Sequence, residues 1–233
     1  MTIYLIPNLL GDTALDTSLP TYVVDTVRRL KHFIVEDEKS ARKFLMLCGV
    51  RPPFEGISFY LLNKHTTHKD KSEILRAVTN EDSGILSEAG CPGIADPGAD
   101  IVGLAHQKGF TVKPLVGPSS ILLALIASGF NGQAFSFHGY IPVNAHERVQ
   151  RIKELEAEAI KTGYTQIFIE TPFRNEHILR DIVATCKPTT LLCMAMDLTL
   201  PTEDVRSANI KDWGAKPLPE CKGRPAVFLI WTV

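Results

Sequence analysis

The sequence has few cysteines, few tryptophans and no excess of either charge. Its five cysteines are widely spaced and form no Cys-x-x-Cys pair: Cys48, Cys91, Cys186, Cys193 and Cys221. Such an odd, dispersed set argues against a disulfide framework and against a zinc site. Twenty-five Lys and Arg against 26 Asp and Glu give a net charge of −1. The overall charge therefore does not indicate a polyanion partner, although a local basic patch stays open. We expect a protein of a reducing compartment, the cytoplasm.

Long apolar runs are also missing. No run reaches the roughly 20 residues that a membrane-spanning helix needs, and the longest candidate, near Ile121, is interrupted by Ser128 and Gly129. The first apolar run is cut by Pro7 and lacks a preceding basic region, so it is typical of a strand rather than a signal peptide. We expect no membrane contact. With 45% hydrophobic and 22% charged residues, the composition is that of an ordinary globular protein.

Short apolar runs alternate with amphipathic segments along the whole chain. They predict strands over 3–6, 32–35, 57–62, 84–87, 111–115, 134–138, 165–170, 190–196 and 226–232. The segments between them predict helices over 21–30, 40–47, 70–78, 100–108, 119–128, 147–161, 175–185 and 207–213. This pattern is typical of an α/β fold with largely parallel strands, whose ligands bind beyond the carboxyl ends of the strands. The turn at Gly117 and Pro118 predicts two domains, residues 1–117 and 118–233.

The segment 86–98 is the most informative one for function. It joins a predicted strand to a predicted helix and contains Gly90, Gly93 and Gly98 together with Pro92 and Pro97. Glycines let a backbone approach a ligand closely, and prolines stiffen the turn. A loop of this length in an α/β domain usually has a function, so we favour ligand binding over a plain connection. It matches neither the phosphate-binding P-loop nor the Gly-x-Gly-x-x-Gly pattern of dinucleotide folds.

The motifs at 87–98, 114–120 and 136–142, with those at 35–43 and 168–174, resemble the tetrapyrrole methylase superfamily of S-adenosylmethionine-dependent methyltransferases. Within it, they are most similar to the branch that 2′-O-methylates a cytidine of small-subunit ribosomal RNA. The resemblance implies two α/β domains of the tetrapyrrole methylase type with the cofactor cleft between them, usually in a homodimer. Compared with that branch, we expect the chain to lack the small C-terminal extension, since it ends at Val233.

The resemblance also implies which residues bind S-adenosylmethionine. Glycine and alanine allow close approach to its methionine part, hydroxyls at a helix start hold its carboxylate, and Met196 offers a polarizable contact to adenine. The matching positions are Leu10, Gly11, Asp12, Ala89, Gly90, Cys91, Pro92, Ile94, Ala95, Ser119, Ser120, Glu170, Met196, Asp197 and Leu198.

The acceptor is inferred from fewer residues. An RNA substrate is expected to contact the cations near these motifs: Lys39, Arg42, Lys43, Arg148, Arg151 and Arg174. Candidates for a general base are Glu36, Asp37 and His65, although Glu36 and Asp37 equally suit the cap of the following helix. The chain departs from the ribosomal branch at Phe173, where that branch has His, and at Leu200, where it has Lys. A methyltransferase of a small-molecule or tetrapyrrole acceptor, and a non-catalytic S-adenosylmethionine-binding module, therefore stay as alternatives.

Three other patterns have simpler interpretations. His65 and His68 lie three residues apart with no third ligand nearby, so we expect exposed turn residues and no metal site. Ser119 and Ser120 lack the Gly-x-Ser-x-Gly pattern of a nucleophile, which favours helix capping with ligand contact. For Cys91 we expect a small residue in a tight turn rather than a reactive thiol.

Overall fold

The chain divides into two compact units, Met1–Ser119 and Ser120–Val233, and the computed structural model describes residues 1–232. Each unit is a sheet covered by helices on both faces. Unit 1 contains β1 (Thr2–Ile6), η1 (Leu15–Thr17), α1 (Thr21–Arg29), β2 (His32–Val35), α2 (Glu38–Leu47), β3 (Ser58–Leu61), α3 (His68–Ala77), β4 (Ser83–Leu86), α4 (Gly98–Gln107) and β5 (Thr111–Pro114).

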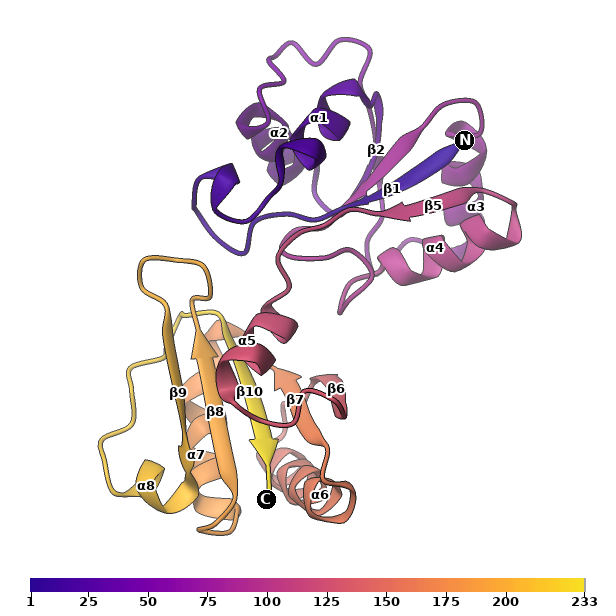
Figure 1. Ribbon diagram of the computed structural model, residues 1–233. Helices are drawn as coiled ribbons and strands as arrows, with labels where there is room; N and C mark the ends of the chain where they lie inside the picture. The colour runs from indigo at the N-terminus through magenta and orange to yellow at the C-terminus, as the bar shows by residue number, and fades with distance from the viewer. Residues whose placement is uncertain (233) are drawn as a thin grey trace. The chain divides into compact units, whose positions relative to one another are not determined.

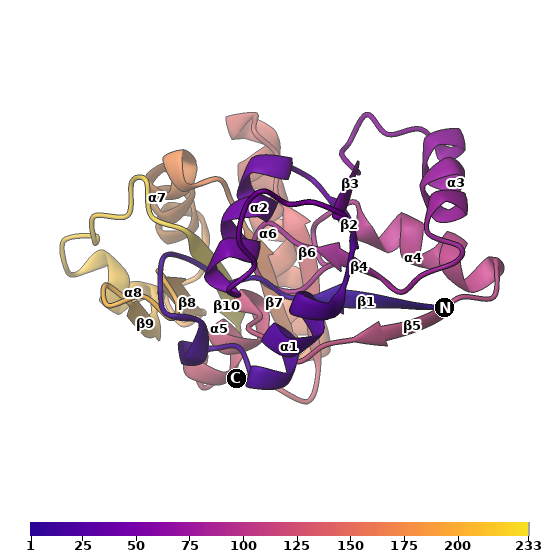
Figure 2. The ribbon, with the colours of Figure 1, turned by 90° about the horizontal axis from the view of Figure 1, so that it is seen from above.

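The five strands of unit 1 are all parallel, in the order β3-β2-β4-β1-β5. Successive side chains of a strand point to opposite faces, so Tyr4 and Ile6 face α1 and α2, whereas Ile3 faces α3 and α4. Figure 2 shows the two helix pairs on opposite sides of this sheet. Because all the strands are parallel, the loops after β1, β2, β3 and β4 leave the same edge.

Unit 2 has a different sheet. It contains α5 (Ser120–Ser128), β6 (Phe135–Tyr140), α6 (Ala145–Thr162), β7 (Thr165–Ile169), η2 (Pro172–Arg174), α7 (Asn175–Thr185), β8 (Leu191–Met196), β9 (Asp204–Asn209), α8 (Ile210–Gly214) and β10 (Ala226–Trp231). Its strand order is β6-β7-β10-β8-β9. The helices α6, α7 and α8 bury one face of the sheet around Phe168 and Phe228, and α5 packs across the other (Figure 1).

Two expectations about unit 2 were wrong. In this sheet only the pair β6–β7 is parallel, whereas the pairs β7–β10, β10–β8 and β8–β9 are antiparallel. A strand buried on both faces is a continuous apolar run in either orientation, so the sequence pattern does not distinguish the two. The predicted helix 207–213 is also wrong over 207–209, because these residues end the edge strand β9. Helix α8 starts only after Asn209, whose side chain accepts a hydrogen bond from the Asp212 amide at 2.8 Å.

None of the helices within residues 1–232 combines the length and apolar character that crossing a membrane requires.

The centre of unit 2 provides a test of this packing. Phe168 and Phe228 stack face to face with ring centroids 5.5 Å apart, and both are fully buried. Phe228→Ala should reduce the free energy of unfolding of unit 2 by about 3–5 kcal/mol through the cavity that it leaves. Phe173→Ala, which removes an exposed ring, should change it by less than about 0.5 kcal/mol. Urea unfolding followed by circular dichroism measures both, and equal effects would contradict the packing.

Candidate functional site

The loops after β1 and β4 are joined to each other by backbone hydrogen bonds. The Asn8 amide donates to the Gly90 carbonyl at 2.9 Å, and the Gly90 amide donates back to Asn8 at 3.1 Å. The Asn8 side chain adds bonds to the carbonyls of Ser87 and Glu88, both at 3.1 Å. This bridge fixes the predicted cofactor segments 10–12 and 89–92 next to each other at the carboxyl edge of the sheet.

Gly90 lies where three segments meet. Its φ of +70° favours glycine, and a Cβ added here would lie 3.3 Å from Leu10 Cδ2 and 3.4 Å from the Pro118 carbonyl oxygen. The Cys91 thiol donates to the same carbonyl, with Sγ and oxygen 3.4 Å apart. Burial raises the pKa of the Cys91 thiol, which keeps it protonated and unreactive. A side chain at Gly90 would therefore strain the backbone and require Leu10 or Pro118 to shift by a few tenths of an ångström.

Asp96 fixes the rest of the glycine-rich loop. Its Oδ1 accepts hydrogen bonds from the amides of Gly93 at 2.8 Å and Gly98 at 2.7 Å. The tip between them exposes Ile94 and Ala95, and Ala95 has a φ of +61°. Asp96 is not among the site residues predicted from the sequence, although Asp followed by Pro-Gly is a common turn signal. A ligand at this loop would meet a preformed backbone.

The loop after β2 adds carboxylates at the same edge. Glu36 is half-buried, and its pKa is raised by burial first and then by the negative charges of Asp96 and Glu88. The Ser40 hydroxyl of α2 donates to Glu88 Oε1 at 2.6 Å. This edge therefore contains a carboxyl group that holds its proton to higher pH than usual.

The other two candidate bases have different surroundings. Asp37 is the N-cap of α2, accepting from the Ser40 amide at 2.8 Å, and this hydrogen bond lowers its pKa. That arrangement is the helix cap named above as the alternative, and it makes Asp37 a weak proton acceptor. His65 is exposed in the segment after β3 and His68 begins α3. Within residues 1–232 no group of three or more His, Cys, Asp or Glu is arranged to hold a metal ion.

In unit 2, the predicted cofactor residues Glu170, Asp197 and Leu198 lie just beyond the ends of β7 and β8. The Glu170 side chain is completely buried, accepts a hydrogen bond from the Thr171 amide at 2.6 Å and forms an ion pair with Arg174. Among the described residues, Glu170 Oε2, Arg174 Nη1 and Asn175 Oδ1 have no hydrogen-bond partner. Buried polar atoms without partners are rare and costly. This edge of unit 2 therefore has unused hydrogen-bonding capacity.

A second ion pair lies at the same edge. Asp197 follows β8 with a φ of +49° and accepts from Arg224 Nε at 2.7 Å and from the Thr202 hydroxyl at 2.9 Å. Asn175 Nδ2 donates to the Arg224 carbonyl at 2.6 Å, which connects the two ion pairs. The Met196 side chain lies in the hydrophobic core, so a ligand near this segment would meet Asp197, Leu198 and the backbone. Ser120 begins α5 and Ser119 precedes it.

Most of the cations expected to contact RNA have partners within the protein. Arg148 is only 8% exposed and pairs with Asp181 at 2.7 Å. Arg151 pairs with Glu154 and Glu158, Arg174 pairs with Glu170, and Arg42 pairs with Glu38 and lies over the rings of Phe54 and Phe59. Lys39 and Lys43 are exposed on α2. All four arginines therefore have carboxylate partners. The pairs of Arg42 with Glu38 and of Arg151 with Glu154 follow the i,i+4 and i,i+3 spacing of a helix, whereas the pair of Arg148 with Asp181 joins two helices.

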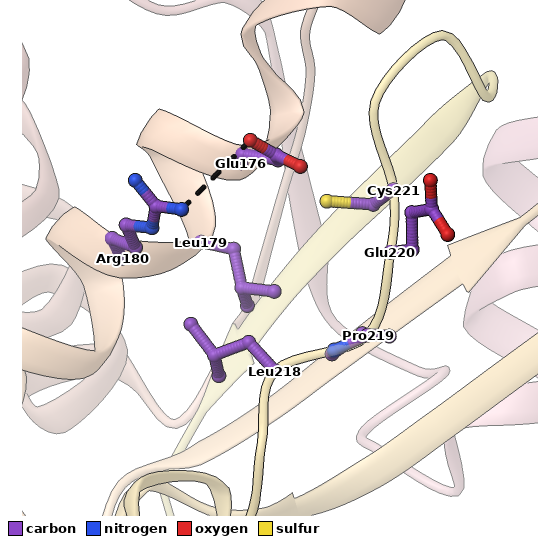
Figure 3. A pocket seen from close by; sticks show the side chains of 7 residues that line it. All are labelled: Glu176, Leu179, Arg180, Leu218, Pro219, Glu220 and Cys221. Atoms are coloured by element: carbon purple, nitrogen blue, oxygen red, sulfur yellow. Dashed lines mark ion pairs between the residues drawn. The ribbon is translucent and has the colours of Figure 1, made fainter.

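A cavity of about 310 Å³ lies elsewhere in unit 2, between α7 and the segment 218–221 (Figure 3). Leu179 and Leu218 form its apolar part, and the Glu176–Arg180 ion pair, with 3.9 Å between Oε2 and Nη2, lies at its side. Burial, and next the charge of Glu176, raise the pKa of the Cys221 thiol. None of the predicted site residues lines this cavity.

Comparison with solved structures defines the class of fold. The chain superposes over its whole length on the methyltransferase CobJ, with a TM-score of 0.64, 17% identity and 93% of that chain covered. It also superposes on uroporphyrin-III C-methyl transferase from Thermus thermophilus complexed with S-adenyl homocysteine. The TM-score is 0.55 at 15% identity, and the match covers 99% of this chain and 97% of that chain. The fold is therefore that of the tetrapyrrole methylases.

In sequence, the chain is similar to proteins named ribosomal RNA small subunit methyltransferase I. The chain is 34% identical to the one from Leptospira borgpetersenii over 62% of this chain and 57% of the relative. It is 26% identical to the one from Vibrio cholerae, over 97% of this chain and 76% of the relative. It is 29% identical to the one from Escherichia coli O157:H7, over 89% of this chain and 69% of the relative. The chain thus spans 57–76% of the length of these relatives. No protein-family model matches. Homology to methyltransferases confirms the resemblance found in the motifs.

The carboxylates of unit 1 generate a prediction. Asp96→Asn removes one negative charge beside Glu36 and keeps the Oδ1 acceptor for Gly93 and Gly98, so the pKa of Glu36 should fall toward its ordinary value. It should stay above that value because burial is the larger cause. Asp82→Asn, a change at the amino end of β4, is the matched control and should leave it unchanged. Carboxyl-carbon NMR titration measures the shift, and equal responses would show that Asp96 and Glu36 do not interact.

The raised pKa also fixes a direction for stability. Between the ordinary glutamate pKa and the raised one, folded Glu36 binds more protons than unfolded Glu36, so this group makes stability fall as the pH rises. The Glu36→Gln variant lacks this titrating group. Between the two pKa values, the free energy of unfolding of the variant should therefore decline less with rising pH than that of the parent.

Proposed function

We propose that this protein is an S-adenosylmethionine-dependent methyltransferase that acts on the ribose 2′-oxygen of ribosomal RNA. The observation that carries the proposal is the sequence relationship at 26–34% identity to proteins named ribosomal RNA small subunit methyltransferase I. The fold supports the methyltransferase class, and the ordered loops of unit 1 support a cofactor site. The proposal includes a homodimer in the cytoplasm, where ribosomal RNA is processed.

The residues of unit 1 fit the methionine part of S-adenosylmethionine. At Gly90 an added Cβ would lie 3.3–3.4 Å from its neighbours, so a side chain would crowd the place where the segments 10–12 and 89–92 meet. The exposed tip at Ile94 and Ala95 is held in place by Asp96. We infer that these loops bind the cofactor through backbone groups. The further cofactor contacts that the resemblance implies, at Ser119, Ser120, Glu170, Asp197 and Leu198, stay predictions.

The bound cofactor supplies a methyl group on a positively charged sulfur. The protein then has to orient the acceptor hydroxyl and take up its proton. Glu36 suits the second task better than Asp37, because a raised pKa brings its proton affinity closer to neutral pH. In this proposal the hydroxyl proton passes to a Glu36 carboxylate oxygen, while Asp37 caps α2 and keeps the end of β2 in place.

A small-molecule acceptor is the second candidate. The observation in its favour is that four of the six expected RNA contacts are engaged in intramolecular ion pairs, which leaves few cations for phosphates. A tetrapyrrole acceptor would use the same cofactor loops of unit 1. The two candidates therefore differ in the acceptor and share the cofactor.

Gly90→Ala tests the proposed cofactor site. The added methyl has to push apart Leu10 and Pro118, so affinity for S-adenosylhomocysteine should fall at least about tenfold, measured by isothermal titration calorimetry. Transfer of labelled methyl from S-adenosylmethionine to ribosomal RNA should fall with it.

Gly109→Ala is the matched control, because Gly109 has a similar φ of +77° but open space around its Cβ position. Both variants carry the same backbone strain, and only Gly90→Ala should lose the ligand. Equal affinities in the two variants would place the cofactor elsewhere. Cofactor binding by the parent without methyl transfer to RNA or uroporphyrinogen would favour a non-catalytic module.

A further inference from the structure

Two exposed aromatic side chains follow neighbouring strands of unit 2. Tyr140 ends β6 and is 56% exposed, and Phe173, just beyond β7, is 75% exposed. The two strands are parallel neighbours, with Tyr140 opposite Ile169, the last residue of β7. Both rings therefore belong to the same edge of the sheet. A single exposed apolar residue is ordinary, but two exposed aromatic rings at the carboxyl ends of adjacent strands call for an explanation.

The backbone is irregular at Tyr140, and at Phe173 it is held by a hydrogen-bonded turn. The register of β6 shifts between Phe137 and Tyr140, and Gly139 has a φ of +64°. Irregularities of this kind re-aim a side chain at a strand end. Phe173 lies in η2, where the Arg174 amide donates to the Thr171 carbonyl at 2.9 Å and the Arg174 side chain pairs with buried Glu170. The turn therefore holds the Phe173 backbone while its ring stays in solvent.

A cation lies beside this turn. The Gly223 amide donates to the Pro172 carbonyl at 3.0 Å, which holds the segment 221–224 against η2. Arg224 is fixed by its bond to Asp197, whereas the neighbouring Lys222 is exposed. The edge thus presents aromatic rings together with a lysine ammonium group. The unpartnered polar atoms of Glu170, Arg174 and Asn175 lie in the same part of the unit.

We propose that Tyr140 and Phe173 form a stacking surface for an unpaired base of single-stranded RNA, and that Lys222 contacts an adjacent phosphate. Proteins recognise unpaired bases by stacking them on aromatic rings and hold the backbone through cations. The proposal rests on the proposed function and names the part of unit 2 that would hold the RNA. It also accounts for an RNA substrate in a protein whose candidate arginines are mostly paired internally.

The test uses the full chain and two labelled RNA probes, an eight-nucleotide oligocytidylate and an abasic strand of the same length and charge. Fluorescence anisotropy should show that the parent binds the base-bearing strand roughly tenfold more tightly. Phe173→Ala and Phe173→Leu should lose most of this preference, whereas Phe173→Trp should keep it. The matched control is Tyr164→Ala, an exposed tyrosine just before β7 at the opposite end of the strand, which should behave like the parent.

Lys222→Ala has a different expected signature. The preference for the base-bearing strand should stay, and the slope of log affinity against log salt should decrease by about 0.7, the value for one phosphate contact on a single strand. An unchanged slope would remove Lys222 from the site.

The outcomes separate this proposal from the proposed function. If the parent methylates ribosomal RNA and Phe173→Ala binds both probes like Tyr164→Ala, the stacking surface is wrong and the function stands. If the parent binds neither probe and methylates no RNA, both are wrong. Binding of uroporphyrin III that depends on Phe173, without any preference for the base-bearing strand, would assign the surface to a tetrapyrrole and overturn the nucleotide proposal.

Discussion

The candidate site of unit 1 depends on one backbone bridge, the pair of hydrogen bonds between Asn8 and Gly90. It joins the loops after β1 and β4. These two strands are neighbours in the sheet, whereas the bridged residues lie about 80 positions apart in sequence. The bridge requires a left-handed conformation at Gly90 in a place with little space for a side chain. Asp96 then closes the remaining loop onto the start of α4. Binding at this edge would therefore involve groups already in position, which lowers the entropy lost on binding.

Unit 2 distributes its charges differently from an open basic surface. Arg148 and Arg224 are in ion pairs with Asp181 and Asp197, and the side chains of both arginines are mostly buried. Breaking such buried pairs is costly because an uncompensated charge remains, so these arginines are poor candidates for release to a phosphate. At the edge where β6 and β7 end, the side chains of Tyr140, Phe173 and Lys222 are exposed to solvent. RNA recognition through stacked bases agrees with this distribution better than recognition through phosphates alone.

The sequence predicted the local features of the fold well, because helices and strands of this chain follow their apolar periodicity. It also indicated the cap at Asp37 and the importance of the segment 86–98. It did not predict strand direction in unit 2 or the edge strand β9, since both are decided by pairing with distant segments. The ion pair of Arg148 with Asp181 was missed for the same reason, because the two residues lie 33 positions apart. The raised pKa of Glu36 comes first from burial and then from the charges of Asp96 and Glu88, and only the fold brings these groups together.

The central claim is that this chain methylates a ribose of ribosomal RNA. The most direct measurement maps ribose methylation of small-subunit ribosomal RNA by mass spectrometry, in cells with the gene, without it, and with the gene restored as the parent or as Gly90→Ala. The account predicts that one 2′-O-methyl nucleotide disappears on deletion, returns with the parent and stays absent or strongly reduced with Gly90→Ala. An unchanged methylation pattern after deletion would contradict it.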